Sequence, residues 1–224
     1  TFQPDLACPG SEEAIQHFSE IAVKNGVQKL VLLSGRGEPE AQACEEIVKN
    51  AGVDWSIVRA SWFSQNFSES FMVEPILAGY VAMSAGNIGE PFVDVEDIAD
   101  VAVAALTSEK HSGKLYEVTG PRLLTFSDAI SEIAKATGRS ILYAEISLEE
   151  YTSQLVEHHV PQEYISLLTY LFREVLDGRN ESITDGVQRA LGRKPTDFAD
   201  YVRRTMATGV WNATSLTCKK NLCY

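Results

Sequence analysis

Cysteine is scarce in this sequence, and the cysteines present have no spacing typical of a metal or redox site. There are four, and none belongs to a Cys-x-x-Cys pair: Cys8, Cys44, Cys218 and Cys223. Small secreted scaffolds that are held together by disulfides use cysteine far more densely, so that class is not expected. Because sparse, unpaired thiols are typical of a reducing compartment, we expect a cytoplasmic protein.

Long hydrophobic runs are also missing. The longest apolar stretch, residues 76–83, contains a glycine and is far shorter than the roughly 18 residues that a membrane-spanning helix requires. The N-terminal residues have neither the basic nor the apolar stretch of a secretory signal. We therefore expect no membrane-spanning segment and no secretion signal.

Basic residues are few relative to acidic ones. Lysine and arginine together number 19 against 31 aspartates and glutamates, which gives a formal net charge of −12 over 224 residues. Proteins that bind nucleic acids usually carry a basic face, and anionic membranes attract basic segments. We therefore expect neither a nucleic acid nor a membrane as a partner. The hydrophobic fraction of 45% is ordinary for a globular chain.

Several catalytic signatures are absent. The sequence contains no Gly-x-Ser-x-Gly elbow, no phosphate-binding P-loop and no His-Glu-x-x-His pair. His158 and His159 are adjacent in an expected helix, where neighbouring side chains point about 100° apart and cannot share a metal. We expect no metal site.

The sequence does contain an alternation of helices and strands joined by short glycine turns. Apolar residues recur at helical spacing over residues 11–25, 38–51 and 98–106. Short apolar runs predict strands over residues 27–33, 55–59, 79–83 and 114–118. This order is typical of an α/β fold with a parallel sheet and right-handed crossovers.

The pattern changes after Gly120-Pro121. Four further helices are expected over residues 125–138, 148–158, 161–176 and 196–207, with one strand over residues 141–146. We therefore predict a sheet domain over residues 1–124, a smaller α-rich lobe over residues 125–210 and an irregular tail over residues 211–224.

The ends of two predicted strands form the candidate ligand site. In open parallel sheets, ligands bind beyond the carboxyl ends of the strands. The residues at and just after these two ends are Ser34, Gly35, Ala60, Ser61, Trp62, Phe63, Asn66 and Phe67. A glycine permits close approach to a ligand, an asparagine can bond an amide or carbonyl, and aromatic rings can wall a planar ring. The alternative is that the aromatic residues pack between the two parts of the chain and Ser34 caps a helix.

Four segments in the same order carry a resemblance to a known family: VQKLVLLSG, DWSIVRASWFSQNFSE, PFVDVEDIADVAVAAL and LYEVTGPRLLTFSDA. Together they resemble the NmrA-like group of atypical short-chain dehydrogenases/reductases. That group includes NAD(P)H-dependent quinone and azo-dye reductases, enzymes similar to festuclavine dehydrogenase, and non-catalytic NADP-sensing regulators. The resemblance covers residues 9–210.

The resemblance implies a Rossmann domain with a C-terminal substrate lobe, and a nicotinamide cofactor, NADP or NAD. Ser34 and Gly35 would lie beside the nicotinamide ribose, and the segment 60–63 would lie near the nicotinamide ring. Asn66 and Phe67 would face a small-molecule substrate. Asp94 and Asp97 resemble an acidic pair of the family, and we interpret them as structural, since they begin a helix.

Two departures from the family pattern concern binding and catalysis. No Gly-x-Gly-x-x-Gly turn occurs, although the family uses such a turn to hold the cofactor diphosphate. The chain is therefore expected to start after the family's early strands, which would leave a sheet edge unpaired for a second subunit to cover. None of the eight tyrosines has a lysine four residues later, so no residue is assigned to catalysis from the sequence.

These observations leave three hypotheses. The chain is an oxidoreductase that transfers hydride from NAD(P)H to a small planar acceptor such as a quinone, azo compound or imine. Alternatively, it is a regulator that senses NAD(P) or binds a protein without turnover, for which the missing tyrosine–lysine pair argues. In the third hypothesis it is a truncated product that does not bind the cofactor, for which the missing glycine-rich turn argues.

Overall fold

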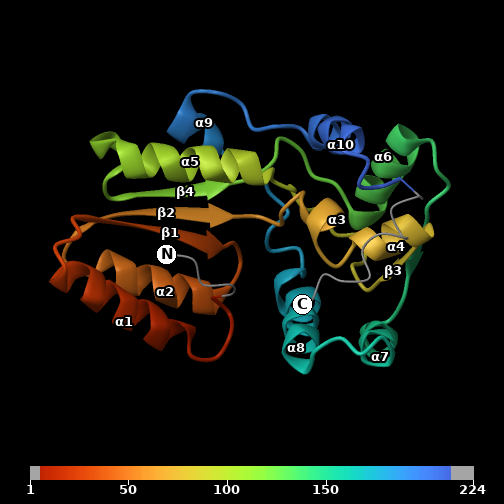
Figure 1. The fold of residues 1–224 in the computed structure, drawn as a ribbon, viewed down its shortest axis with the longest axis horizontal. Helices are drawn as coiled ribbons and strands as arrows, with labels where there is room; N and C mark the ends of the chain where they lie inside the picture. The colour runs from red at the N-terminus through yellow and green to blue at the C-terminus, as the bar shows by residue number, and fades with distance from the viewer. Residues whose placement is uncertain (1–5, 213–224) are drawn as a thin grey trace.

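The computed structural model describes residues 6–212; residues 1–5 and 213–224, which include Cys218, Cys223 and most of the predicted tail, lie outside the described residues. Three parallel strands form the main sheet in the order β1 (Lys29–Gly35), β2 (Asp54–Ala60) and β4 (Lys114–Val118) (Figure 1). The predicted parallel α/β sheet is confirmed. The first two strands lie up to two residues from their expected positions, and β4 matches its prediction.

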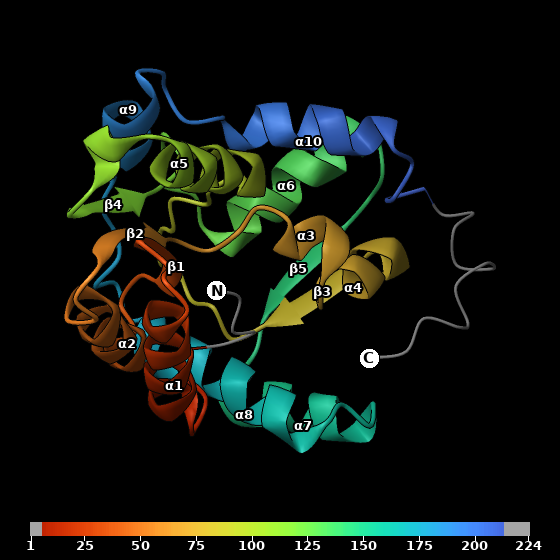
Figure 2. The same cartoon turned by 60° about the vertical axis from the view of Figure 1, so that its left-hand side comes forward.

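Helices cover both faces of this sheet (Figures 1 and 2). On one face, α1 (Ser11–Lys24) and α2 (Pro39–Lys49) enclose a core with Leu30, Leu32 and Ile57. On the other face, α5 (Val95–Thr107) and α9 (Gly186–Leu191) enclose Val58 and Val118, and a short 3₁₀ turn (Glu109–His111) follows α5. The fold is therefore a three-layer arrangement of the Rossmann type.

The strand β1 lies at one edge of the main sheet. Within residues 6–212, no strand pairs with the side of β1 that faces away from β2. Its residues alternate between buried and half-buried, whereas Ile57 and Val58 in the central strand are both completely buried. Helices nevertheless cover both faces of β1, since Leu30 and Leu32 belong to the core under α1 and α2 while Val31 and Leu33 pack against the core under α5 and α9.

The remaining elements build a second cluster beside the sheet. A two-stranded parallel sheet joins β3 (Tyr80–Met83) to β5 (Leu142–Glu145). Around it lie α3 (Asn66–Glu69), α4 (Val73–Ala78), α6 (Phe126–Thr137), α7 (Leu148–Glu157), α8 (Gln162–Tyr170), a π-helical turn (Leu171–Val175) and α10 (Phe198–Ala207). Aromatic rings fill its centre, with Phe126 touching both Phe67 and Phe92.

This second cluster draws on residues from both sides of the predicted boundary at residue 124. Phe67, Met72 and Ile76 pack in one core with Ile130 and Ile133. In the opposite direction, α9 returns to the main sheet, where Gly186 lies so close to the carbonyl of Glu117 that a Cβ would clash with it. Residues from before the predicted boundary therefore pack in the second cluster, and α9, which follows that boundary, packs on the main sheet.

Caps and ion pairs fix the start of α5. Asp94 accepts a hydrogen bond from the Glu96 amide, and it also pairs with Arg204. Asp97 is fully buried and accepts from Arg193 (2.5 Å) and from the amide of Thr196 (2.6 Å). The structural interpretation of both aspartates is confirmed. In α1, by contrast, the N-cap residue is Gly10, and no side chain caps the helix.

No helix within residues 6–212 is long and apolar enough to cross a membrane.

Candidate active site at the carboxyl ends of the strands

The structure brings the two predicted strand ends together. Gly35 and Ala60 are partners in the β1–β2 register, and the amide of Arg36 donates to the carbonyl of Ala60 (2.9 Å). The amide of Ser61 donates to the carbonyl of Val118 at the end of β4 (3.1 Å). All three strands of the main sheet therefore end at one place, as the sequence predicted for β1 and β2.

Ser34 points toward α2. Its hydroxyl donates to Glu45 Oε1 (2.7 Å), and the serine is 4% exposed. Arg59 binds the same carboxylate through Nε (2.8 Å) and Nη2, so Glu45 is fully paired although it is completely buried. In this structure the Ser34 hydroxyl therefore holds the sheet to α2, and the contact with a ribose that the resemblance implies stays a prediction.

Gly35 lies directly against the carboxylate of Glu38. A Cβ at position 35 would clash with that carboxylate, so the close approach that the sequence predicts at this glycine is made by a side chain of the protein itself. The next residue, Arg36, reaches away from the sheet and donates to the carbonyls of Asn180 (2.8 Å) and Ser182 (2.9 Å). Through these two hydrogen bonds, Arg36 holds the segment around residue 180 next to the carboxyl end of β1.

The segment after β2 is held in place by backbone hydrogen bonds to Val93. The carbonyl of Trp62 accepts from the amide of Val93 (2.9 Å), and the amide of Ser64 donates to the carbonyl of Val93 (2.8 Å). The indole of Trp62 is half-buried and packs against Phe126 and Phe172, with centroid distances of 5.3 and 5.6 Å. This segment is therefore a fixed aromatic wall between the sheet and the second cluster.

Asn66 and Phe67 differ in how deeply their side chains are buried. Asn66 begins α3 and is half-buried. Phe67 is completely buried, and its ring packs against Phe92 and Phe198 at 5.1 and 5.2 Å. In this structure Phe67 acts through packing, as the alternative interpretation of the aromatic residues expected, and it presents no surface to a ligand.

Glu90 is a site residue that sequence reasoning missed. Its Oε2 accepts a hydrogen bond from Ser61 Oγ (3.1 Å), its side chain is completely buried, and its Oε1 has no hydrogen-bond partner within residues 6–212. Burial raises the pKa of Glu90 from its ordinary value to about 7. A glutamate between a glycine and a proline is typical of an exposed turn, so no local pattern indicates this burial.

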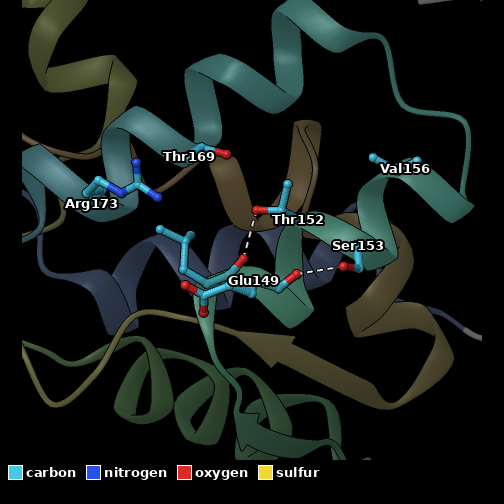
Figure 3. A pocket seen from close by; sticks show the side chains of 7 residues that line it. Glu149, Thr152, Ser153, Val156, Thr169 and Arg173 are labelled. Atoms are coloured by element: carbon cyan, nitrogen blue, oxygen red, sulfur yellow. Dashed lines mark hydrogen bonds between the residues drawn. The ribbon is translucent and has the colours of Figure 1, made fainter.

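The second cluster has a separate hollow of about 440 Å³ between α7 and α8 (Figure 3). Leu148 and Val156 are among the residues that line it, and Arg173 lies on the opposite side from Val156. Two of the three hydroxyl residues that line it bond to the backbone of α7, since Thr152 donates to the carbonyl of Leu148 (2.7 Å) and Ser153 to that of Glu149 (2.8 Å). None of the site residues predicted from the sequence lines this hollow.

Metal ligands do not gather at the strand ends. Among the residues that the structure describes, no three histidine, cysteine, aspartate or glutamate side chains are grouped in a way that could hold a metal ion.

Comparison with known proteins gives relatives over most of the chain. Agroclavine dehydrogenase from Claviceps fusiformis is 31% identical over 206 residues, which cover 88% of this chain and 70% of the relative. The NAD(P)H azoreductase from Xenophilus azovorans is 25% identical over 162 residues, which cover 71% of this chain and 55% of the relative. No protein-family model matches the sequence.

Solved structures show the same fold. An NADPH-dependent quinone oxidoreductase from Escherichia coli, in complex with NADPH, superposes with a TM-score of 0.78 at 18% sequence identity. The superposition covers 88% of this chain and 72% of that protein. Because the sequence identity is low, this likeness concerns the fold.

Proposed function

This chain belongs to the NmrA-like family of atypical short-chain dehydrogenases/reductases, and on that premise we propose that it is an NAD(P)H-dependent oxidoreductase that reduces a small planar acceptor. The observation that carries the proposal is the convergence of Gly35, Ser61 and Trp62 where the three strands of the main sheet end. Quinones, azo compounds and imines are the acceptors considered.

The described residues fit the nicotinamide end of such a cofactor. The half-buried Trp62 and Phe63 offer flat apolar surfaces, and two buried oxygens without partners, Ser64 Oγ and Glu90 Oε1, lie in the same region. They do not fit the cofactor diphosphate, because the sequence has no glycine-rich turn and the Glu38 carboxylate lies at Gly35. We therefore assign only the nicotinamide end to these residues.

The residues at the strand ends would bind, orient and exclude water. A reduced nicotinamide supplies a hydride when it is bound. Backbone atoms of segment 60–63 would hold its ring, Trp62 would stack along a planar acceptor, and Asn66 would orient a polar atom of that acceptor. Holding two reactants at the right distance is a large part of what such a site contributes to the rate.

A calorimetric titration with NADPH and NADH tests cofactor binding directly. It is followed by oxidation assays of the reduced cofactor with a quinone, an azo dye and an imine. We expect binding and turnover by the natural chain and a loss of both in Trp62→Leu. The matched control is Trp55→Leu, because Trp55 is also half-buried but lies at the opposite end of β2.

The missing tyrosine–lysine pair favours a second candidate, a non-catalytic sensor of NAD(P). Binding of the cofactor without turnover of any of the three acceptors would support the sensor. Absence of binding by a folded chain would contradict both candidates and favour the truncated product.

We also propose that a second copy of the chain pairs with the open edge of β1. This strand has no proline, and its one charged residue is Lys29, so it lacks the features that usually protect a sheet edge. The helices on the two faces of the sheet also expose apolar side chains, Phe18 and Ile21 on α1 and Val103 and Leu106 on α5. We propose in addition that the protein is cytoplasmic, because its cysteines are sparse and sparse thiols are typical of a reducing compartment.

A further inference from the structure

We propose that Ser61 and Glu90 deliver the proton that the acceptor needs when it is reduced. Ser61 is the proposed catalytic residue, since its hydroxyl would touch the acceptor. Glu90 is a positioning residue that acts through Ser61 by holding and replacing the proton. This inference rests on the proposed function, because Ser61 and Glu90 can act as proton donors only if the chain reduces an acceptor that takes up a proton together with the hydride.

The position of Glu90 is fixed by its backbone. Its amide donates to the carbonyl of Leu124 (2.9 Å), and its carbonyl accepts from the amide of Leu124 (3.0 Å). The residue is followed by Pro91, whose carbonyl accepts from the amide of Gly120 (3.0 Å). The carboxyl group is therefore held beside Ser61, in the segment that follows β2, and does not turn out to solvent.

The hydrogen bonds around Glu90 leave one oxygen without a partner. Oε2 is bonded to Ser61 Oγ, whereas Oε1 is buried and unpartnered in the part of the chain that the structure describes. A buried ionised carboxylate normally has several donors or a cation, and an unpaired one is strongly destabilising. The arrangement fits a carboxylic acid that keeps its proton near neutral pH.

The charged groups that face Glu90 are Arg36 and Glu181. The Arg36 guanidinium is directed to Asn180 and Ser182 and lies 3.8 Å from Glu117. The Glu181 carboxylate accepts from the amide of Gly89 (2.7 Å) and opposes ionisation of Glu90. The hydrogen bond from Ser61 and the charge of Arg36 favour the ionised form of Glu90, and Glu181 favours the neutral form. Burial is the largest of these effects, so the pKa of Glu90 is raised.

Other carboxyl groups at this end of the sheet are less suited to the task. Glu45 and Glu117 both pair with Arg59, so each of these side chains already has a cationic partner. Within residues 6–212 Glu90 has no such ion-pair partner, and burial raises its pKa. A buried acid with a pKa near the working pH is well suited to proton transfer.

The proton balance of the step is simple. The acceptor receives a hydride at one atom, and its heteroatom receives the proton of the Ser61 hydroxyl as that O–H bond breaks. In the structure the Ser61 hydroxyl donates to Glu90 Oε2, so for this step it turns to the acceptor and the Glu90 carboxylic acid carries its proton on Oε2. As the Ser61 O–H bond breaks, Oε2 gives this proton to Ser61 Oγ, which restores the serine and leaves a carboxylate. The carboxylate then regains a proton from solvent, so each turnover consumes one hydride and one proton.

The first test needs neither cofactor nor substrate. Difference infrared spectroscopy between the natural chain and Glu90→Gln should reveal a carboxylic acid that ionises close to pH 7. Glu109→Gln, which removes an exposed carboxylate far from the strand ends, should leave this signal in place. Ionisation of Glu90 near the ordinary glutamate value would overturn the inference.

The second test measures kcat/KM against pH with a quinone. In the natural chain it should be level below about pH 7 and fall tenfold per pH unit above it. Glu90→Gln should remove this fall and lower the level part by about 10²–10⁴-fold, and Ser61→Ala should do the same. Glu109→Gln should keep the natural profile.

The outcomes separate this inference from the proposed function. Turnover with an unchanged pH profile in Glu90→Gln or Ser61→Ala overturns the proton pair alone. Cofactor oxidation that is absent in the natural chain with every acceptor overturns the proposed function, and the pair with it, even where the infrared titration shows an acid that ionises near pH 7.

Discussion

The indole of Trp62 and the ring of Phe172 lie 5.6 Å apart between centroids, although one follows β2 and the other belongs to the π-helical turn after α8. Phe172 also packs against Tyr151 of α7 at 5.3 Å. The aromatic wall at the strand ends is therefore supported by the second cluster, and a change in α7 or α8 reaches the candidate site through Phe172.

Removing the ring of Phe172 should destabilise the chain and weaken acceptor binding. Phe172 is 6% exposed, so Phe172→Ala should cost about 3–5 kcal/mol of unfolding free energy. It should also raise the KM for a planar acceptor, because Trp62 loses its support. Denaturant unfolding and steady-state kinetics measure the two effects. Phe18→Ala, at a site that is 41% exposed, should cost less than about 1 kcal/mol. An equal loss in both variants would contradict the supporting role.

Replacing Glu90 should change how stability depends on pH. Because burial raises its pKa from 4.5 to about 7, the folded chain binds more protons than the unfolded chain between these values. The free energy of unfolding should therefore fall as pH rises through this window. In Glu90→Gln this fall is absent, so the variant should gain about 3 kcal/mol over the natural chain between pH 4 and pH 8. Urea unfolding at several pH values measures the difference, and parallel curves would contradict the burial argument.

The buried carboxylate of Asp97 should matter far more than its exposed neighbour. Asp97→Asn turns an amide group toward Arg193 and the Thr196 amide, which are donors, and should cost about 2–3 kcal/mol. Asp100 also pairs with Arg193 but is exposed, so Asp100→Asn should cost less than about 1 kcal/mol. Thermal unfolding of the two variants checks the ranking. A similar cost at both positions would mean that Arg193 contributes through surface charge alone.

A lysine in β1 should block association along the sheet edge. Val31→Lys places a charge in the middle of this half-buried strand, and lysine is a residue that natural edge strands use against pairing. We expect sedimentation velocity to show a dimer for the natural chain and a monomer for the variant. Val156→Lys, on the exposed side of α7, should remain a dimer. A monomeric natural chain would exclude this pairing.

Much of the sheet follows from local patterns. The strand β4 and the helices α1, α2 and α6 lie within one or two residues of their predicted positions because each has an apolar face and a clear terminus, such as the capping box at Thr125. The six-residue helix α9 was missed because it is too short to show a periodicity. Residues 161–176 were expected as a single α-helix, whereas the structure has α8 followed by a π-helical turn over Leu171–Val175.

The candidate site was only partly predictable. The glycine and the aromatic residues at the strand ends were found, since chain order places them beyond parallel strands. The partners of Ser34 and Ser61 were not found, because Glu45 and Glu90 come to them from separate elements. Such contacts depend on the three-dimensional path of the chain, and residue type alone does not reveal them.

The pairing of β3 with β5 has a consequence for dissecting the protein. A fragment that starts at residue 125 would keep β5 and lose its hydrogen-bonding partner, along with Phe67 and Ile76 from the same core. A junction at the apparent lobe boundary would therefore divide one hydrophobic core, and chimaeras between relatives should take the segment around Phe67 and Ile76, β3 and β5 from the same parent.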